Sequence, residues 1–223
     1  IERFAKAAHA HGVPLIVDAS QSAGVLSVDL EGWGAAFIAM PGHKGLYGPQ
    51  GTGLLLCGGD AQPLLYGGTG SLSQRQEMPD FLPDRLEAGT HNVCGAAGLL
   101  EGMKFVCRTG VGRIHRHEQT LAKRMMDILG RCPGVTVFRG GPGCQSGLCS
   151  IIVDGMDCEE AGEALARRGI AVRAGLHCAP LAHSTAGTLD TGTIRLSFSA
   201  FNRPDQAERA AAAIKELAGR NGK

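Results

Sequence analysis

The sequence predicts an α/β protein followed by a separate α+β unit. Short apolar runs rich in Leu, Ile and Val alternate with segments of helical periodicity along the 223 residues. The 34 glycines suit many tight turns, and because only 4% of the residues are aromatic, the core must be built mainly from aliphatic side chains. From about residue 134 onward, strand-like and helix-like segments follow one another in the order typical of an α+β domain.

The first half of the chain should contain one helix and three buried strands. Residues 1–11 carry apolar side chains at helical spacing and run into Gly12-Val13-Pro14, which predicts a helix and its end. Buried strands are expected where apolar runs occur, at residues 15–17, 35–39 and 54–56. Residues 58–92 are rich in Gly, Pro, Ser and Asp, which predicts long loops of the kind that often carry function.

The second half should begin with a largely helical segment over residues 95–131, ended by Pro133-Gly134. Strands are then expected at residues 134–138, 147–153, 170–173 and 193–198, and helices at residues 157–168 and 204–219. The segment between the last two strands reads as a loop. This order predicts a large domain over residues 1–105 and a small C-terminal domain over residues 106–223.

Composition narrows the class of protein. Lys and Arg number 22 and Asp and Glu 21, so the net charge of +1 favours neither nucleic acid nor an anionic membrane as a partner. No apolar run is long enough to cross a bilayer, and the eight cysteines include no C-x-x-C pair, which argues against a metal site and for reduced thiols. We expect a cytoplasmic protein. The start at Ile1, inside an apparent helix, predicts that an N-terminal portion is absent.

The most informative pair of residues is Asp18 and Lys44, each of which follows a predicted strand. Carboxyl ends of strands in open α/β sheets are where ligands bind. A pyridoxal cofactor needs a carboxylate to keep its ring nitrogen protonated and a lysine to form an imine with its aldehyde. Taken singly, a lysine is usually a surface charge and an Asp after a strand usually a turn or helix cap. Together, the two residues predict a pyridoxal 5'-phosphate site.

Three motifs carry a resemblance to a known family. They are D-A-S-Q at 18–21, G-H-K-G-L-Y-G-P-Q-G-T-G at 42–53 and R-A-G-L-H-C-A-P at 173–180. With them the chain resembles class V aminotransferase-fold enzymes, in particular the cysteine desulfurase and selenocysteine lyase family. The resemblance implies the type I fold of pyridoxal-phosphate-dependent transferases, with this chain as the C-terminal part of the large mixed-sheet domain and a smaller α+β C-terminal domain.

The resemblance also implies roles for individual residues. Asp18 would pair with the pyridine nitrogen, Gln21 would donate to the phenolic oxygen, Lys44 would form the imine and His43 would lie beside the phosphate. Pro41 departs from the family pattern, which often has Ser or Thr three residues before the lysine, and it offers neither a hydroxyl nor an N–H. The family's phosphate-binding turn and its stacking ring belong to the N-terminal part that this chain does not contain.

A homodimer with shared active sites is implied by the segment Glu87-Ala88-Gly89-Thr90. In the family the corresponding segment reaches across the dimer interface, so Thr90 would touch the phosphate of the neighbouring subunit. Thr69, in a glycine-rich stretch, is a candidate for a related role, although that stretch reads equally well as a flexible turn.

Cys178 and Arg195 distinguish between reactions. Cys178, in a loop after Arg173 and next to His177, is the expected nucleophile that takes sulfur from a bound cysteine. Arg195 lies in an alternating strand, where its guanidinium can hold an amino acid's carboxylate by two parallel hydrogen bonds. Cys144 stays open. The remaining cysteines are expected to be buried and structural; they are Cys57, Cys94, Cys107, Cys132, Cys149 and Cys158.

The expected function is therefore that of a pyridoxal-phosphate-dependent cysteine desulfurase or selenocysteine lyase, acting on an amino acid and passing sulfur through Cys178 to an acceptor protein. One alternative keeps the fold but uses it for aminotransfer or another lyase reaction, in which Cys178 would be dispensable. A second alternative is a non-catalytic fragment or interaction domain, motivated by Pro41 and by the missing phosphate turn.

Overall fold

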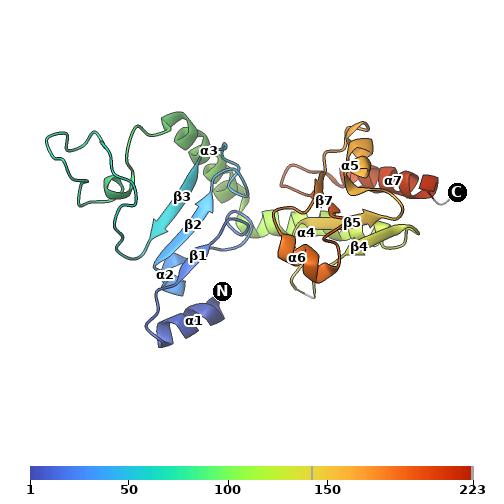
Figure 1. The fold of residues 1–223 in the computed structure, drawn as a ribbon, viewed down its shortest axis with the longest axis horizontal. Coiled ribbons are helices and arrows are strands. Elements are labelled where there is room, and N and C mark those ends of the chain that lie inside the picture. The colour runs from blue at the N-terminus through green and yellow to red at the C-terminus, as the bar shows by residue number, and fades with distance from the viewer. Residues whose placement is uncertain (142, 222–223) are drawn as a thin grey trace. The chain divides into compact units, whose positions relative to one another are not determined.

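A computed structural model describes residues 1–141 and 143–221 of the chain. The chain divides into two compact units, Ile1–Gly112 and Arg113–Lys223, each with its own sheet and hydrophobic core (Figure 1). Both units combine helices with strands, as the sequence predicted. The domain boundary proposed after residue 105 stays a prediction.

The first unit is built around a three-stranded sheet in the order β1-β2-β3. β1 runs parallel to β2, and β2 runs antiparallel to β3. The elements of this unit are α1 (Glu2–Ala10), β1 (Ile16–Asp18), α2 (Leu30–Trp33), β2 (Phe37–Pro41), β3 (Gly53–Cys57), the 3₁₀ helix η1 (Asp84–Leu86) and α3 (Val93–Thr109). The predicted helix and all three predicted strands of this half are confirmed to within two residues at each end.

The core of the first unit joins the sheet to the segments that follow its strands. Ile38 and Met40 of β2 point into it, and Leu99 packs there from α3. Ala19, directly after β1, and Leu46, in the loop after β2, are buried in the same cluster. The two loops at the carboxyl ends of the parallel strands are therefore anchored on one set of apolar side chains.

The segment between β3 and α3 is a long excursion, as predicted, and η1 is its one helix (Figure 1). Arg85 of η1 links the end of this segment to its beginning, because its Nη1 donates to Asp60 Oδ1 at 2.7 Å. Leu64 is 93% exposed and Leu65 and Tyr66 are also exposed, so these side chains contribute nothing to the core of this unit.

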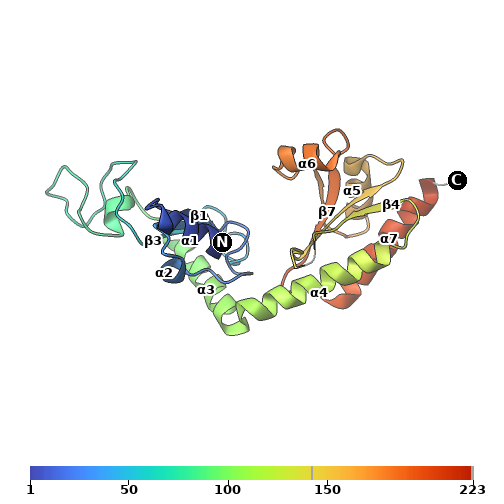
Figure 2. The same ribbon diagram turned by 90° about the horizontal axis from the view of Figure 1, so that it is seen from below.

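The second unit contains a four-stranded antiparallel sheet in the order β4-β5-β7-β6. Its elements are α4 (Val111–Leu129), β4 (Val135–Phe138), β5 (Leu148–Val153), α5 (Cys158–Ala166), β6 (Arg173–Gly175), α6 (Pro180–Ala186), β7 (Thr193–Ser197) and α7 (Pro204–Asn221). Helices α4 and α7 run beside each other in Figure 2, and an ion pair between Arg124 and Glu208 links them.

The two faces of this second sheet differ in character. Ile151 of β5 and Ile194 of β7 are cross-strand partners on the face covered by the apolar sides of α4, α5 and α7. Because side chains alternate along a strand, Thr193 and Arg195 point to the opposite face. Arg195, singled out from the sequence, is therefore displayed on that opposite face.

Two local predictions in the second half were wrong. The strand expected at residues 170–173 is found at Arg173–Gly175, because Ile170 and Val172 pack against the core without joining the sheet. The predicted loop before β7 contains α6, which starts with Pro180 and stops at Gly187 in the left-handed conformation. Residues 95–131 are largely helical, as predicted, and form two helices because Gly110, with a φ of 89°, ends α3.

Within the described part of the chain, none of the helices has the length and apolar character needed to span a membrane. Cys149 is fully buried, as expected for a structural cysteine, but Cys94 and Cys107 are exposed on α3, so the expectation of burial was wrong for those two. Cys57, Cys132 and Cys158 are half-buried.

Candidate active site

Asp18 is the last residue of β1, and because β2 runs parallel to β1, both strands end at the same edge of the sheet. The parallel pairing sets Asp18 beside Ala39. β2 ends two residues later at Pro41, and Lys44 follows three residues after Pro41 in the next loop. The Ser20 backbone N–H donates to Asp18 Oδ1 at 2.8 Å. The Ser20 side chain and then its backbone N–H lower the pKa of the Asp18 carboxyl; a cost of burial opposes them, and the charge of Lys44 adds a smaller lowering. Asp18 is thus held as an exposed carboxylate.

The Lys44 loop is closed by its own backbone. The Gly42 N–H donates to Thr52 O at 2.8 Å, and the Gly48 N–H donates to Gly42 O at 2.8 Å. The second bond closes the loop between Gly42 and Gly48. Within it, the Tyr47 N–H donates to Lys44 O at 2.9 Å. Tyr47 has a φ of 57°, unusual for a residue other than glycine, and its ring meets Phe105 edge-on. These contacts fix the backbone while the Lys44 side chain stays exposed.

Two glycines bring the Asp18 segment and the Lys44 loop into direct backbone contact. A Cβ on Gly24 would lie 1.9 Å from the carbonyl oxygen of Gly45, and a Cβ on Gly45 would lie 2.3 Å from Ala23 O. Neither position can therefore hold a side chain without moving the other segment. From the other side α3 approaches the same loop, where a Cβ on Gly102 would lie 2.3 Å from Leu46 O.

Three further predicted residues of this unit, Gln21, His43 and Thr90, have exposed side chains. Gln21 and His43 lie on the two segments just described, one on each. Thr90 is farther along the chain, but its segment is tied to the glycine-rich stretch that carries Thr69, because the Gly89 N–H donates to Gly68 O at 2.8 Å. The structure therefore brings together the Thr69 and Thr90 segments, which the sequence singled out separately.

In the second unit, Cys178 projects from a tight turn after β6. His177 and Cys178 both have left-handed backbone conformations, with φ of 54° and 60°, and the Ala179 N–H donates to Leu176 O at 2.9 Å. Cys178 is exposed, and its Sγ lies 3.7 Å from Nη2 of Arg173. Two consecutive non-glycine residues in the left-handed conformation cost conformational energy. The Cys178 thiol is therefore presented to solvent by a strained backbone.

Arg173 and Arg195 are cross-strand partners on β6 and β7. Like charges directly opposite each other destabilise a sheet unless an anion lies between or near them. Among residues 1–141 and 143–221, no Asp or Glu forms an ion pair with either guanidinium, and Arg195 Nε is buried without a hydrogen-bond partner. The pair is therefore suited to bind an anion.

Sequence reasoning missed a histidine and threonine cluster behind this turn. His177 Nε2 lies 3.0 Å from Thr193 Oγ1, and the buried His183 of α6 has its Nδ1 2.8 Å from Thr188 Oγ1. The two imidazole rings are 5.6 Å apart. His177 was noted only as a neighbour of Cys178, and no local pattern marked His183, because its partners become close only through α6.

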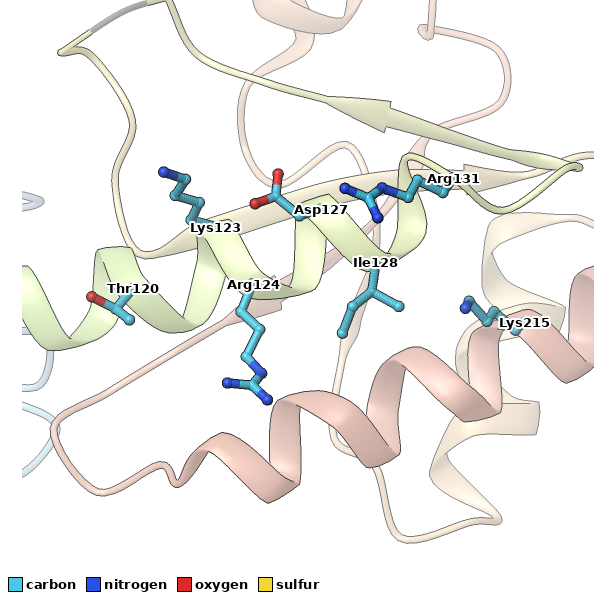
Figure 3. A pocket seen from close by; sticks show the side chains of 7 residues that line it. All are labelled: Thr120, Lys123, Arg124, Asp127, Ile128, Arg131 and Lys215. Atoms are coloured by element: carbon cyan, nitrogen blue, oxygen red, sulfur yellow. The ribbon is translucent and has the colours of Figure 1, made fainter.

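A separate groove of about 540 Å³ lies between α4 and α7 (Figure 3). Four basic side chains line it together with Ile128; they are Lys123, Arg124, Arg131 and Lys215. Asp127, also in the lining, pairs with Arg139, and Arg124 pairs with Glu208. The groove contains none of the residues predicted to take part in catalysis, so it is not the candidate active site.

The predicted residues thus form two groups. Asp18, Lys44 and the residues around them belong to the first unit, and Cys178 with Arg195 belongs to the second. In the described residues, no set of three or more His, Cys, Asp and Glu side chains is arranged to hold a metal ion. The first group offers a carboxylate and an amine at a sheet edge, and the second offers a thiol beside two guanidinium groups.

The family model for aminotransferase class V matches residues 1–209. A probable cysteine desulfurase of Methanothermobacter thermautotrophicus is 33% identical over 98% of this chain and 56% of its own length. A second one, from Halalkalibacterium halodurans, is 34% identical over 97% of this chain and 53% of its own. The chain therefore spans about half the length of these relatives.

Solved structures agree with these relatives. The apo cysteine desulfurase of Thermococcus onnurineus superposes with a TM-score of 0.88 at 34% identity, covering 99% of this chain and 56% of that one. The cysteine desulfurase CsdA of Escherichia coli gives a TM-score of 0.85 at 31% identity, covering 98% and 55%. The fold class predicted from the sequence is confirmed.

Proposed function

Because the chain belongs to the aminotransferase class V family, we propose that the protein is a pyridoxal-phosphate-dependent cysteine desulfurase in which Cys178 accepts the sulfur. The observation that carries this proposal is the exposed thiol of Cys178, held on a left-handed turn with a guanidinium nitrogen 3.7 Å from its sulfur. An aminotransferase or another lyase of this fold has no need of such a thiol. The names of the similar proteins and solved structures described above support the same choice.

The residues of the first unit fit pyridoxal phosphate. Asp18 is an anionic carboxylate, with its pKa lowered mainly by Ser20, and this is the state required to keep a pyridine nitrogen protonated. Lys44 presents its amine at the same sheet edge, on a loop fixed by the contact of Gly24 with Gly45. Gln21, His43 and, from a partner subunit, Thr90 complete the proposed set of cofactor contacts.

When bound, the cofactor supplies an electron sink that stabilises negative charge at the substrate's α-carbon. Lys44 Nζ holds the cofactor and, once released, takes the α-proton of the substrate and later returns protons to it. Arg195 holds the substrate carboxylate by its planar fork of donors. Asp18 keeps its charge throughout, since its low pKa leaves it ionised near neutral pH.

Cys178 performs the sulfur transfer. Its thiolate attacks the sulfur of the bound cysteine, so that a sulfur–sulfur bond forms and the substrate's carbon–sulfur bond breaks with its electron pair left on carbon. Protonation of that carbon gives alanine. Cysteine and the protein thiol are thereby converted to alanine and a protein persulfide, with no further oxidant or reductant. An acceptor protein then takes the terminal sulfur.

The assembly and location of the protein belong to the same proposal. A homodimer is supported by the exposed Thr90 segment, which the Gly89-to-Gly68 hydrogen bond joins to a second glycine-rich stretch. The cytoplasmic location stays a prediction.

The proposal is tested by alanine release from L-cysteine in the intact protein with pyridoxal phosphate. Wild type should release alanine, Cys178→Ser should lose at least about 99% of the rate because the nucleophile is gone, and Cys144→Ser, at another exposed cysteine, should retain it. Equal rates in Cys178→Ser and wild type would favour a lyase that does not use this thiol. A Lys44→Ala variant should lose the visible absorbance band of the bound cofactor, whichever reaction is catalysed.

A further inference from the structure

Two polar atoms on one side of the second sheet are buried without a hydrogen-bond partner among the described residues. They are Nδ1 of His177 and Nε of Arg195. Buried polar atoms are nearly always paired, and those that are not are often found at functional sites. Arginine Nε–H can only donate, whereas a neutral imidazole has one nitrogen that accepts. The two atoms therefore have complementary needs.

The fold sets the two side chains over the same face of β7. Thr193 and Arg195 are two residues apart on that strand, so both point away from the apolar core. His177 Nε2 lies 3.0 Å from Thr193 Oγ1, which holds the imidazole over this face. His183, fixed by Thr188, contacts the ring of His177 from another side, with the two ring centres 5.6 Å apart.

The protonation state of His177 suits the role of acceptor. Burial lowers the pKa of its imidazole, and the positive charges of Arg195, His183 and Arg173 lower it further, so the ring is neutral near pH 7. The backbone of Thr193 acts in the opposite direction, which favours a ring N–H on the side facing that residue. With Nε2 protonated toward Thr193, Nδ1 carries the free lone pair.

We propose that His177 is a positioning residue for Arg195, with its Nδ1 accepting the Arg195 Nε–H, directly or through one water, when the substrate carboxylate is bound. This inference rests on the proposed role of Arg195 in carboxylate binding. Holding Nε–H fixes the plane of the guanidinium and leaves its two terminal nitrogens free for the two carboxylate oxygens. His177 thereby links the position of the substrate to the turn that carries Cys178, its neighbour in the chain.

Steady-state kinetics of the intact, cofactor-loaded protein test this inference. His177→Leu should raise the KM for L-cysteine about tenfold and change kcat less than about threefold, because positioning of a substrate-binding group is lost. His177→Asn, which retains an acceptor near the position of Nδ1, should recover most of the loss, whereas His177→Gly, which tolerates the left-handed backbone but has no acceptor, should not. His11→Leu, on the other unit, is the surface control. A KM unchanged in His177→Leu would overturn the proposal.

A double-mutant cycle distinguishes this inference from the proposed function. If Arg195→Ala raises KM strongly, then adding His177→Leu to it should raise KM no further, because the two residues act through one interaction. Fully additive effects would overturn the role of His177 while leaving Arg195 as the anchor. If Arg195→Ala alone leaves KM unchanged, the anchor itself is wrong.

Nitrogen NMR of the histidine-labelled protein gives a readout independent of catalysis. The shifts of His177 at pH 7 should report a neutral ring protonated at Nε2, with Nδ1 unprotonated. A ring protonated at Nδ1 would contradict the proposal, because Nδ1 would then be a donor facing another donor.

Discussion

The guanidinium of Arg173 lies beside the thiol of Cys178, with Nη2 3.7 Å from Sγ, across the left-handed turn that follows β6. Arg173 is also the cross-strand partner of Arg195. The nucleophile and the proposed substrate anchor are thus connected through one pair of strands. Because the register of β6 on β7 fixes this arrangement, substitutions of Arg173 should act on the thiol without disturbing the fold.

Arg173→Ala should slow persulfide formation on Cys178 by about 10- to 100-fold, the loss expected for one hydrogen bond to a charged group. Arg173→Lys keeps the charge but lacks the planar fork, so its rate should lie between those of Arg173→Ala and wild type. Single-turnover kinetics with cysteine measure the rate. Arg167→Ala, at an exposed arginine paired with Glu163, is the matched control. An unchanged rate in Arg173→Ala would show that the guanidinium has no part in the transfer.

Gly24→Ala should destabilise the protein and weaken cofactor binding together. The new Cβ would lie 1.9 Å from Gly45 O, and the φ of +85° disfavours any side chain, so we expect a loss of about 2–4 kcal/mol. Gly51→Ala separates the two causes, because its φ is +74° but nothing lies within 4 Å of the new Cβ. It should cost only about 1–2 kcal/mol. Chemical denaturation gives the stabilities; equal losses would show that the close approach is not tight.

The carboxyl of Asp18 should titrate below its usual pKa of 3.8. Since the folded-state value is the lower one, the stabilisation from this carboxylate is complete above pH 3.8 and is lost as the pH falls through the folded-state pKa. Ser20→Ala removes the largest cause of the shift and should move the pKa back toward 3.8. Carbon NMR of the aspartate side chains measures this change directly. A Ser20→Ala pKa equal to that of wild type would assign the shift to other groups.

The cysteines should differ sharply in their reaction with an alkylating reagent. Burial raises the pKa of the Cys149 thiol to about 12, so at pH 8 it is protonated and also inaccessible. Cys178 and Cys144 are exposed. Under native conditions, mass spectrometry should find these two modified and Cys149 unmodified. Rapid modification of Cys149 would mean that the core of the second unit opens readily.

The strands of the first unit, and the placement of Asp18 and Lys44 after two of them, could be predicted because they depend on local sequence. The run Leu15-Ile16-Val17 before Asp18 is apolar enough to indicate a buried strand, and parallel pairing then puts Asp18 and Lys44 at the same edge. The close approach of Gly24 to Gly45 could not be read in this way. Glycine alone does not reveal which backbone lies opposite it.

In the second unit, the missed features are those that depend on contacts distant in sequence. The predicted strand at residues 170–173 began too early. Ile170 and Val172 are apolar because they pack against the core, and they do not pair with a neighbouring strand. The partnership of His177 with Thr193 spans 16 residues and requires α6 to be placed first. Pro180 and Gly187 mark the ends of α6, and they were the local signal available for it.

The most direct test of the proposed function is to locate the transferred sulfur after a single turnover. The intact protein with pyridoxal phosphate is mixed with one equivalent of L-cysteine, quenched with an alkylating reagent, digested and analysed by mass spectrometry. We predict one additional sulfur atom on the peptide containing Cys178, in an amount equal to the alanine formed. Alanine formed without sulfur on Cys178, or sulfur carried by Cys144 instead, would contradict the assignment of Cys178 as the sulfur acceptor.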